Sequence, residues 1–429
     1  MKHFLYITIY LIITGTLYSG ETGVLKLTDS AGIEQLNFPS GTALYLYLID
    51  PDQNTNVLES ETVTVNVISD TETTPELVSL YETGQNTGNF IGSIVFDAVN
   101  SASIGDGKLQ VQKGDKLTGT YIDPYDDFNN EKTITDVSFY DATTQSGTIS
   151  ENTTWSKANS PYLITGDVTV VNSITLTIDP GVEVRFVANT DDLASGSDIN
   201  RSELRIEGIL RAIGTVEDSI IFTSNAEVPA VGDWSGIKVL NSSSKALLDY
   251  CRIEYGNYGL EISGDTNVSD RDTILVENSL FQYGGTSLYQ CHNCGYNRPI
   301  YFNNNTVINA DAVNIQWEIF SAEIKNNTIT NGKIYIRIRR ASNSEDSLYN
   351  NIDISGNSLT FSENYGYSAI LCDLDIEGNI ININFNNNTI VGPVYTGIHV
   401  YQNSSNSNNK TYITMMGNQI DNVRHNGIY

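Results

Sequence analysis

The sequence has 429 residues, 40% of them hydrophobic, and a formal net charge of −28. This length is enough for two or three domains with sizeable cores. The negative charge argues against nucleic acids and anionic membranes as partners, and it is compatible with divalent cations as ligands.

The chain opens with a segment that is typical of a secretory signal peptide, residues 1–20. An apolar run over residues 4–13 is followed by small and polar residues. The run is too short to span a bilayer, and no later segment is long and apolar enough to be transmembrane. We therefore expect cleavage near Ser19 or Gly20 and a protein that is secreted or displayed at the cell surface.

Residues 21–142 alternate apolar and polar side chains between turn clusters. Residues 21–141 contain 20 Asp and Glu, 5 Lys and no Arg, a charge bias that marks a domain. The alternation predicts short strands, no helix, and an antiparallel β-sandwich. The expected strands cover residues 24–27, 43–48, 62–67, 77–81, 90–96, 108–111, 116–121 and 133–139.

Three phrases of this domain occur in a fixed order. They read ALYLYLIDPDQNTN, VSLYETGQNTGNFIGSI and GDGKLQVQKGDKLTGTYIDP. Through them the domain resembles a sandwich repeat that is common in large bacterial surface proteins. The resemblance implies an immunoglobulin-like spacer in an extracellular protein and no catalytic role.

Two acidic turns of this domain are candidates for a calcium site. Each follows an alternating strand, so its oxygen atoms would gather at a loop end, as a hard cation requires. An EF-hand is excluded because Thr55 stands where that loop needs glycine. Asp and Asn chosen for turn geometry beside proline explain the pattern equally well. The candidate ligands are Asp50, Asp52, Asn54, Asp123, Asp126 and Asp127.

Residues 143–160 are expected to form a linker that leads into a second domain, because they are rich in Ser, Thr and Asn. Later in the chain, an asparagine followed by strand residues recurs at spacings of 27, 22, 30, 31 and 30 residues. Such variable spacing suits coils of a parallel β-helix. We expect these asparagines to stack as an inward ladder. They are Asn278, Asn305, Asn327, Asn357, Asn388 and Asn418.

The first coils of this domain contain TWSKANSPYLITGDVTVVNSITLTIDPGVEVRF, ELRIEGILRAIG and IIFTSNAEVPAVGDWSGIKV. In this order they resemble right-handed parallel β-helix proteins of bacterial surfaces, members of the wider pectate-lyase-like superfamily. The resemblance covers residues 147–429 and implies an all-β chain with a right-handed parallel β-helix over residues 161–429. That superfamily includes lyases, hydrolases, epimerases and adhesins, so no single activity follows.

The second strand of each repeat should point alternate side chains outward. Aligned coils place Gln316, Arg337, Asp373 and Tyr401 in one outward column, Asn314, Tyr335, Leu371 and His399 in the next, and Glu318 beside Arg339. Arginine can clasp sugar carboxylates and tyrosine can stack on sugar rings. A plain solvated strand surface is the alternative. The candidate glycan-binding residues are Tyr335, Arg337, Arg339, Asp373, His399 and Tyr401.

No catalytic residue is assigned. Superfamily hydrolases of polygalacturonate use Asn-Thr-Asp, Gly-His-Gly and Arg-Ile-Lys phrases on adjacent coils. This chain has Asn189-Thr190-Asp191-Asp192 without the other two phrases, so this segment is expected to be a polar loop. We therefore favour a non-catalytic adhesive or structural rod that binds polysaccharide. A polysaccharide lyase or glycoside hydrolase acting on an acidic glycan is the alternative.

The chain contains four cysteines. Cys251 and Cys372 lie about four coils apart and should not bridge, because coils are about 4.8 Å apart and a disulfide needs α-carbons within about 7 Å. Cys251 is expected to be a buried substitute in the ladder. Cys291 and Cys294 could form a disulfide, stay free or bind a metal; a metal is less favoured because no second ligand pair is present.

The last residues, 424–429, align with the start of another outward strand. No polar cap follows them, although the ends of solenoids need one. We therefore expect the chain to be the front part of a longer protein that contains further coils and an anchor.

Overall fold

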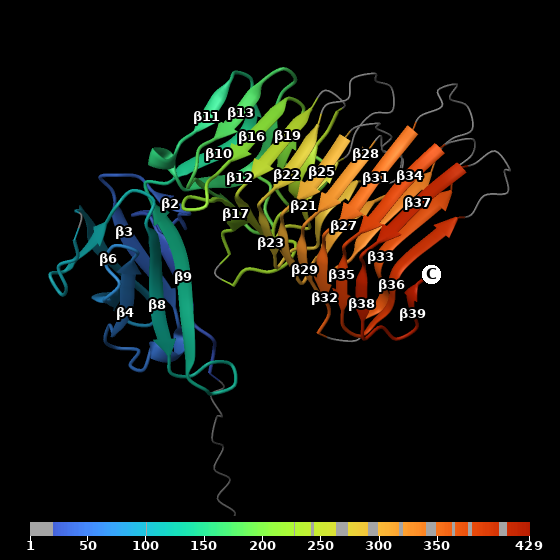
Figure 1. Ribbon diagram of the computed structural model, residues 1–429. Coiled ribbons are helices and arrows are strands. Elements are labelled where there is room, and N and C mark those ends of the chain that lie inside the picture. Colours follow the sequence, from blue (N-terminus) through green and yellow to red (C-terminus); the bar gives the residue numbers. More distant parts are fainter. Residues whose placement is uncertain are drawn as a thin grey trace, which may run out of the picture. The chain divides into compact units, whose positions relative to one another are not determined.

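The computed structural model describes residues 20–99, 101–226, 228–241, 244–262, 273–290, 299–316, 321–339, 349–362, 365–375, 380–402 and 410–429. It consists of β-strands and short 3-10 turns in two compact units, Met1–Asp141 and Ala142–Tyr429 (Figure 1). The predicted all-β chain, an antiparallel β-sandwich followed by a parallel β-helix, is confirmed. Within the described ranges no helix is long and apolar enough to cross a membrane.

The N-terminal unit contains all eight predicted strands and one short additional strand. They are β1 (Val24–Thr28), β2 (Asn37–Phe38), β3 (Ala43–Ile49), β4 (Thr62–Ser69), β5 (Glu76–Glu82), β6 (Asn89–Ala98), β7 (Lys108–Val111), β8 (Lys116–Asp123) and β9 (Lys132–Tyr140), with the 3-10 turn η1 (Pro51–Gln53).

These strands form one sheet that curls back on itself. The order is β1-β3-β6-β5-β4-β8-β9-β2, with β7 beside β6, and all pairs are antiparallel except β2 with β9 and β6 with β7. Leu27 of β1 lies against Gly119 of β8, although four strands separate β1 from β8 in the order of the sheet. The two halves therefore enclose a common core of buried aliphatic and aromatic side chains, as in a sandwich.

The second unit is a parallel β-helix with three stacks of strands. The first stack contains β11 (Thr153–Trp155), β13 (Thr175–Ile178), β16 (Ile209–Ile213), β19 (Lys245–Asp249), β22 (Ile274–Glu277), β25 (Pro299–Asn303), β28 (Ser321–Lys325), β31 (Tyr349–Ser355), β34 (Ile380–Asn386) and β37 (Lys410–Met416). The second contains β14 (Glu183–Phe186), β17 (Ile220–Ser224), β20 (Cys251–Glu254), β23 (Leu280–Gln282), β26 (Thr306–Ile308), β29 (Thr328–Thr330), β32 (Ser358–Thr360), β35 (Thr389–Val391) and β38 (Gln419–Asp421). The third contains β10 (Thr143–Ile149), β12 (Tyr162–Val170), β15 (Glu203–Ile206), β18 (Gly236–Val239), β21 (Tyr258–Ile262), β24 (Thr286–Gln290), β27 (Asp311–Ile315), β30 (Ile334–Arg339), β33 (Tyr365–Asp375), β36 (Val394–Gln402) and β39 (Asn426–Ile428).

Residues 143–160, predicted as a linker leading into the helix, contain strands of the β-helix. β10 pairs in parallel with β12, and β11 with β13. The 3-10 turn η2 (Lys157–Asn159) lies between β11 and β12. The β-helix unit therefore begins at Ala142, directly after the last residue of the N-terminal unit.

The interior of the β-helix is built from columns of aliphatic residues. Parallel pairing between coils sets side chains of equal orientation above one another, and branched side chains pack well on such a surface. In the third stack one inward column contains Leu204, Ile237, Leu260, Leu288, Val313, Ile334, Ile370 and Ile398, all buried. The predicted alternation in this stack is confirmed.

The predicted asparagine ladder is present in the interior. Asn305, Asn327, Asn357 and Asn388 are buried. The Oδ1 atom of each accepts the backbone N–H of the ladder residue one coil earlier at 2.9–3.0 Å. Each Nδ2 group donates to a main-chain carbonyl of the preceding coil. These bonds satisfy the amides and offset the cost of burying them.

Asn278 lies one position outside this ladder. The pairing of β23 with β26 sets Ser279 above Asn305, and the Ser279 N–H donates to Oδ1 of Asn305. Asn278 adopts a left-handed backbone with φ of 48°, and its Nδ2 donates to Asp249 instead. The assignment of Asn278 to the ladder is therefore wrong by one residue.

The described cysteines agree with the prediction. Cys251 holds the ladder position before Ser279, and its N–H donates to the Ser279 hydroxyl at 3.0 Å. Cys251 and Cys372 are buried free thiols. Burial raises the pKa of both, that of Cys372 to about 12, so both remain protonated and pack as small apolar groups. Cys291 and Cys294 lie outside the described residues.

Candidate functional site

A groove on the outer face of the third stack crosses three successive coils. It has a volume of about 400 Å³. Strands β30, β33 and β36, which pair with one another in parallel, provide its floor. The lining residues are Lys333, Tyr335, Gly366, Tyr367, Ser368, Leu371, Tyr395 and His399. We call this surface the tyrosine groove.

Aromatic and cationic side chains of the tyrosine groove contact one another. The Lys333 ammonium lies 4.9 Å from the centre of the Tyr367 ring and 3.3 Å from a carboxylate oxygen of Asp311. The Tyr395 ring stacks on His425, with centroids 4.8 Å apart. Tyr367 is 67% exposed and Tyr395 47%. Both rings therefore expose surface that a ligand can contact.

Polar groups at the floor of the tyrosine groove are held by neighbouring atoms or are partly buried. Ser368 Oγ lies 3.4 Å from Nδ1 of His399. Burial raises the pKa of the Tyr335 hydroxyl, so this group stays protonated at neutral pH and can donate a hydrogen bond. The groove thus combines aromatic surface with a few fixed polar groups, as small-molecule sites commonly do.

The structure brings most of the predicted binding residues together. Tyr335 and His399 line the tyrosine groove. Arg337 and Asp373 form the neighbouring outward column, where Arg337 Nε lies 3.1 Å from Asp373 Oδ2, and Tyr401 is paired with Asp373 on the next coil. The side chain of Arg339 lies outside the described part of the structure, as does Glu318.

Sequence reasoning missed Lys333, Tyr367 and Tyr395. Lys333 directly precedes β30 and lies two residues before Tyr335, a spacing that alternation could have used. Tyr367 lies where the pairing of β33 with β36 shifts register, between Tyr365 and Ser368. Counting alternate residues back from the strand core is unreliable across such an irregularity.

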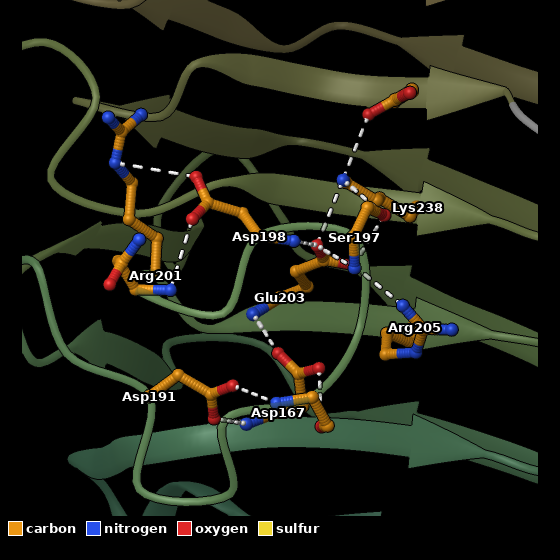
Figure 2. Close-up of polar contacts among 11 residues, drawn as sticks. Asp167, Asp191, Ser197, Asp198, Arg201, Glu203, Arg205 and Lys238 are labelled. Carbon is orange, nitrogen blue, oxygen red and sulfur yellow. Dashed lines mark hydrogen bonds and ion pairs between the residues drawn. The ribbon is translucent and has the colours of Figure 1, made fainter.

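The first coils contain a buried ionic cluster that the sequence did not reveal (Figure 2). The Glu203 side chain is completely buried, and its carboxylate lies 2.9 Å from both the Lys238 ammonium and the Arg205 guanidinium. Lys238 is 5% exposed and also lies 3.3 Å from Glu261. Two loop N–H groups, of Ser197 and Asp198, donate to the same Glu203 oxygen. The cluster is fully occupied by its own members, which indicates a structural role.

The loop over residues 187–202 is fastened onto the sheet by this cluster and by two further carboxylates. Asp167 accepts from the Ser195 hydroxyl and the Glu203 N–H at 2.8 and 2.9 Å. Asp191 accepts the N–H groups of Asp167, Leu193 and Ser195. The segment containing Asp191 is therefore a polar loop, as expected, whose carboxylate stabilises its turn.

Asp167 offers a test of this arrangement through pH. Burial, together with the nearby Glu203 and Asp191 carboxylates, raises the pKa of Asp167 in the folded protein. From about pH 4 up to that raised value the folded state binds more protons than the unfolded state, so stability falls as pH rises. We expect Asp167→Asn, which keeps an oxygen acceptor, to reduce this fall. Urea unfolding at a series of pH values measures it; parallel curves for both proteins would contradict the assignment.

Carboxylates of the two acidic turns in the N-terminal unit accept hydrogen bonds from protein donors, whereas Asn54 donates one. Asp50 is buried and accepts the Tyr121 hydroxyl at 2.6 Å, and burial raises the pKa of Asp50. Asp126 accepts the N–H groups of Phe128 and Asn130. The Asn54 amide donates to Asn86.

The remaining acidic-turn carboxylates bind the segment that directly precedes β1. Asp52, Asp123 and Asp127 accept N–H groups of residues 21–23. In the described ranges no group of three or more His, Cys, Asp or Glu side chains is arranged to hold a metal ion. The contacts thus give the turns a role that the sequence did not suggest.

Comparison with known protein families found a match that lies in the β-helix. Residues 147–290 match the family model of the pectate-lyase like beta helix domain. No curated protein matches the chain. Beyond the matched residues, strands β25 to β39 continue the same three stacks. Residues 147–290 are therefore similar to a pectate-lyase-like β-helix domain.

Proposed function

We propose that this protein is exported and binds glycans in the tyrosine groove of its β-helix without altering them chemically. The observation that carries the proposal is that Tyr335, Tyr367 and Tyr395, which come from three successive coils, line one groove of about 400 Å³. The flat faces of tyrosine rings suit the apolar faces of sugar rings, while their hydroxyl groups bind sugar hydroxyls.

The charges around the tyrosine groove favour binding over catalysis. The neighbouring carboxylates Asp311 and Asp373 are each held by a cation, Lys333 and Arg337 respectively. Glycoside hydrolysis generally needs two carboxyl groups free to act on either side of the scissile bond. Paired carboxylates and cations can instead provide hydrogen bonds to sugar hydroxyl groups, and a cation can share its donors with a sugar carboxylate.

Export is supported by the start of the sequence. The apolar run over residues 4–13 and the small residues after it have the composition of a secretory signal. A resident of the cell surface meets polysaccharides there, which fits a glycan-binding groove on a rod-like domain.

Removal of groove tyrosines tests the binding function. We expect Tyr367→Ala and Tyr395→Ala each to weaken glycan binding by about fivefold, because a stacked aromatic contributes about 1 kcal/mol. Affinity electrophoresis in gels containing neutral or acidic polysaccharides measures the change. Tyr412→Ala is the matched control, since Tyr412 is 54% exposed on β37 of the first stack. Equal retention of all variants, or an equal loss in the control, would contradict the proposal.

A further inference from the structure

The first described residues of the chain are held by side chains of the two acidic turns. The N–H of Gly20 donates to Oδ1 of Asn129 at 2.9 Å. The N–H of Glu21 donates to Oδ2 of Asp52 at 2.7 Å. Both acceptors come from turns distant in the sequence, so these contacts are tertiary.

The next two residues continue this pattern. The N–H of Thr22 donates to Oδ1 of Asp127 at 3.0 Å, and its hydroxyl donates to Oδ2 of the same residue at 2.9 Å. The N–H of Gly23 donates to Oδ2 of the buried Asp123 at 2.8 Å. Four consecutive N–H groups that precede the first strand are thus bound by four side chains. The side chains of these turns therefore bind residues 20–23 of the same chain.

Gly20 fits this position closely. A β-carbon at Gly20 would lie 2.3 Å from the carbonyl oxygen of Asp126 and 2.4 Å from that of Tyr125. Such separations are far below van der Waals contact, so a larger residue would have to displace the turn. Carbonyl oxygens carry partial negative charge, and the oxygen of Asn129 accepts the N–H of the same residue. This setting favours a positive charge at residue 20.

Space for a free amine is present beside Gly20. A cavity of about 540 Å³ borders it and is lined in part by Asp52, Tyr125 and Asn129. An ammonium group has three hydrogen atoms to donate, compared with one for a peptide N–H. The cavity can admit water to the additional donors, and the Asp52 carboxylate supplies a negative charge one residue along the segment. A charge-assisted contact is about twice as strong as a neutral one.

We propose that the leader is cleaved between Ser19 and Gly20 and that the new α-ammonium of Gly20 stays bound between the acidic turns. The inference rests on the proposed export and identifies its processing site. In the cleavage, a host signal peptidase adds water across the Ser19–Gly20 peptide bond. Ser19 leaves with the new carboxylate, and the Gly20 nitrogen gains protons to become an ammonium. In the processed chain, the charged ammonium of Gly20 therefore replaces its neutral peptide N–H as the donor to Asn129.

The first experiment identifies the terminus made in cells. The full chain is produced with its own leader in a secreting bacterium, and the protein outside the cells is analysed by N-terminal sequencing and intact mass. We expect Gly20 as the first residue, with an unblocked amine. An exported protein that begins at any other residue overturns the inference while leaving export in place. Retention inside the cell with the leader attached overturns export.

The second experiment tests the binding of the Gly20 ammonium between the acidic turns, and it does not depend on export. The chain is released from a cleavable fusion so that it begins either at Gly20 or at Ser19, and hydrogen exchange of residues 21–28 is followed by mass spectrometry. We expect exchange to be about fivefold slower when the chain begins at Gly20. Asp52→Asn, which keeps an oxygen acceptor and removes the charge, should abolish most of this difference.

Asp29→Asn is the matched control for the second experiment. Asp29 also accepts backbone N–H groups, those of Ala31 and Ile33, but within its own turn. The difference between the two starting residues should persist in this variant. Equal exchange in the two unmodified forms, or loss of the difference in both aspartate variants, overturns the binding of the ammonium.

Discussion

Replacement of Asn327 by leucine is expected to lower the free energy of unfolding of the β-helix by about 3–5 kcal/mol. Oδ1 of Asn327 accepts the N–H of Asn305 at 2.9 Å, and its Nδ2 donates to the Phe302 carbonyl and to Asn357 Oδ1 at 2.9 and 2.8 Å. Leucine removes all three bonds and leaves a buried N–H and a buried carbonyl without partners. Each such group costs about 1–3 kcal/mol.

Urea unfolding followed by circular dichroism measures this loss. The control is Asn382→Leu, because Asn382 has the same chemistry but its amide contact, with Asn351, is exposed. The control should lose less than about 1 kcal/mol. Glycan binding by Asn327→Leu should be unchanged under native conditions. A similar loss of stability in both variants would contradict a ladder that stabilises through its buried amides.

Lys238→Met is expected to cost about 3–5 kcal/mol, because it removes one partner of a buried ion pair. The side chain of Glu203 is completely buried, and its carboxylate would lose the Lys238 ammonium, which lies 2.9 Å away. The Ser197 N–H would still donate to it. The charge of Glu203 would then be compensated by Arg205 alone. The loop over residues 187–202 would lose the bond between the ammonium and the Ser197 hydroxyl.

A double-mutant cycle measures the interaction energy between Lys238 and Glu203 separately from their contacts with other residues. Lys238→Met combined with Glu203→Gln should be less destabilised than the sum of the single variants, because the double variant no longer buries a charged Glu203 without Lys238. Lys325→Met provides the control: Lys325 is 29% exposed and pairs with Glu323 and Asp353, and it should lose less than about 1 kcal/mol. Equal losses for Lys238→Met and Lys325→Met would show that burial does not strengthen the cluster.

The columns of the β-helix could be predicted because strand alternation has a fixed period of two. The ladder position was harder to assign. Asn304, Asn326 and Asn387 adopt positive φ directly before ladder asparagines, so the same residue type serves two adjacent positions. Asn278 occupies the first of these positions and Ser279 the second. Residue type alone does not separate them, because asparagine suits both a left-handed turn and a hydrogen-bonded ladder.

The polar clusters could not be predicted for a different reason. Glu203 and Lys238 are separated by 35 residues and meet only because the register of β15 with β18 and the intervening loop bring them together. Similarly, the composition of the acidic turns suggested a cation, and no pattern of side chains reveals that Asp52, Asp123 and Asp127 accept the backbone N–H groups of residues 21–23. Backbone partners across long loops are not encoded by local periodicity.

Incubation of the full chain with an acidic polysaccharide, with and without calcium, tests the proposed function most directly. Binding is followed by retention of the polysaccharide, and turnover by chain length and by ultraviolet absorbance of unsaturated sugar ends. We predict retention that depends on Tyr367 and Tyr395, with unchanged chain length and absorbance. Release of shortened or unsaturated products would show catalysis and contradict the account, as would the absence of binding to both neutral and acidic polysaccharides.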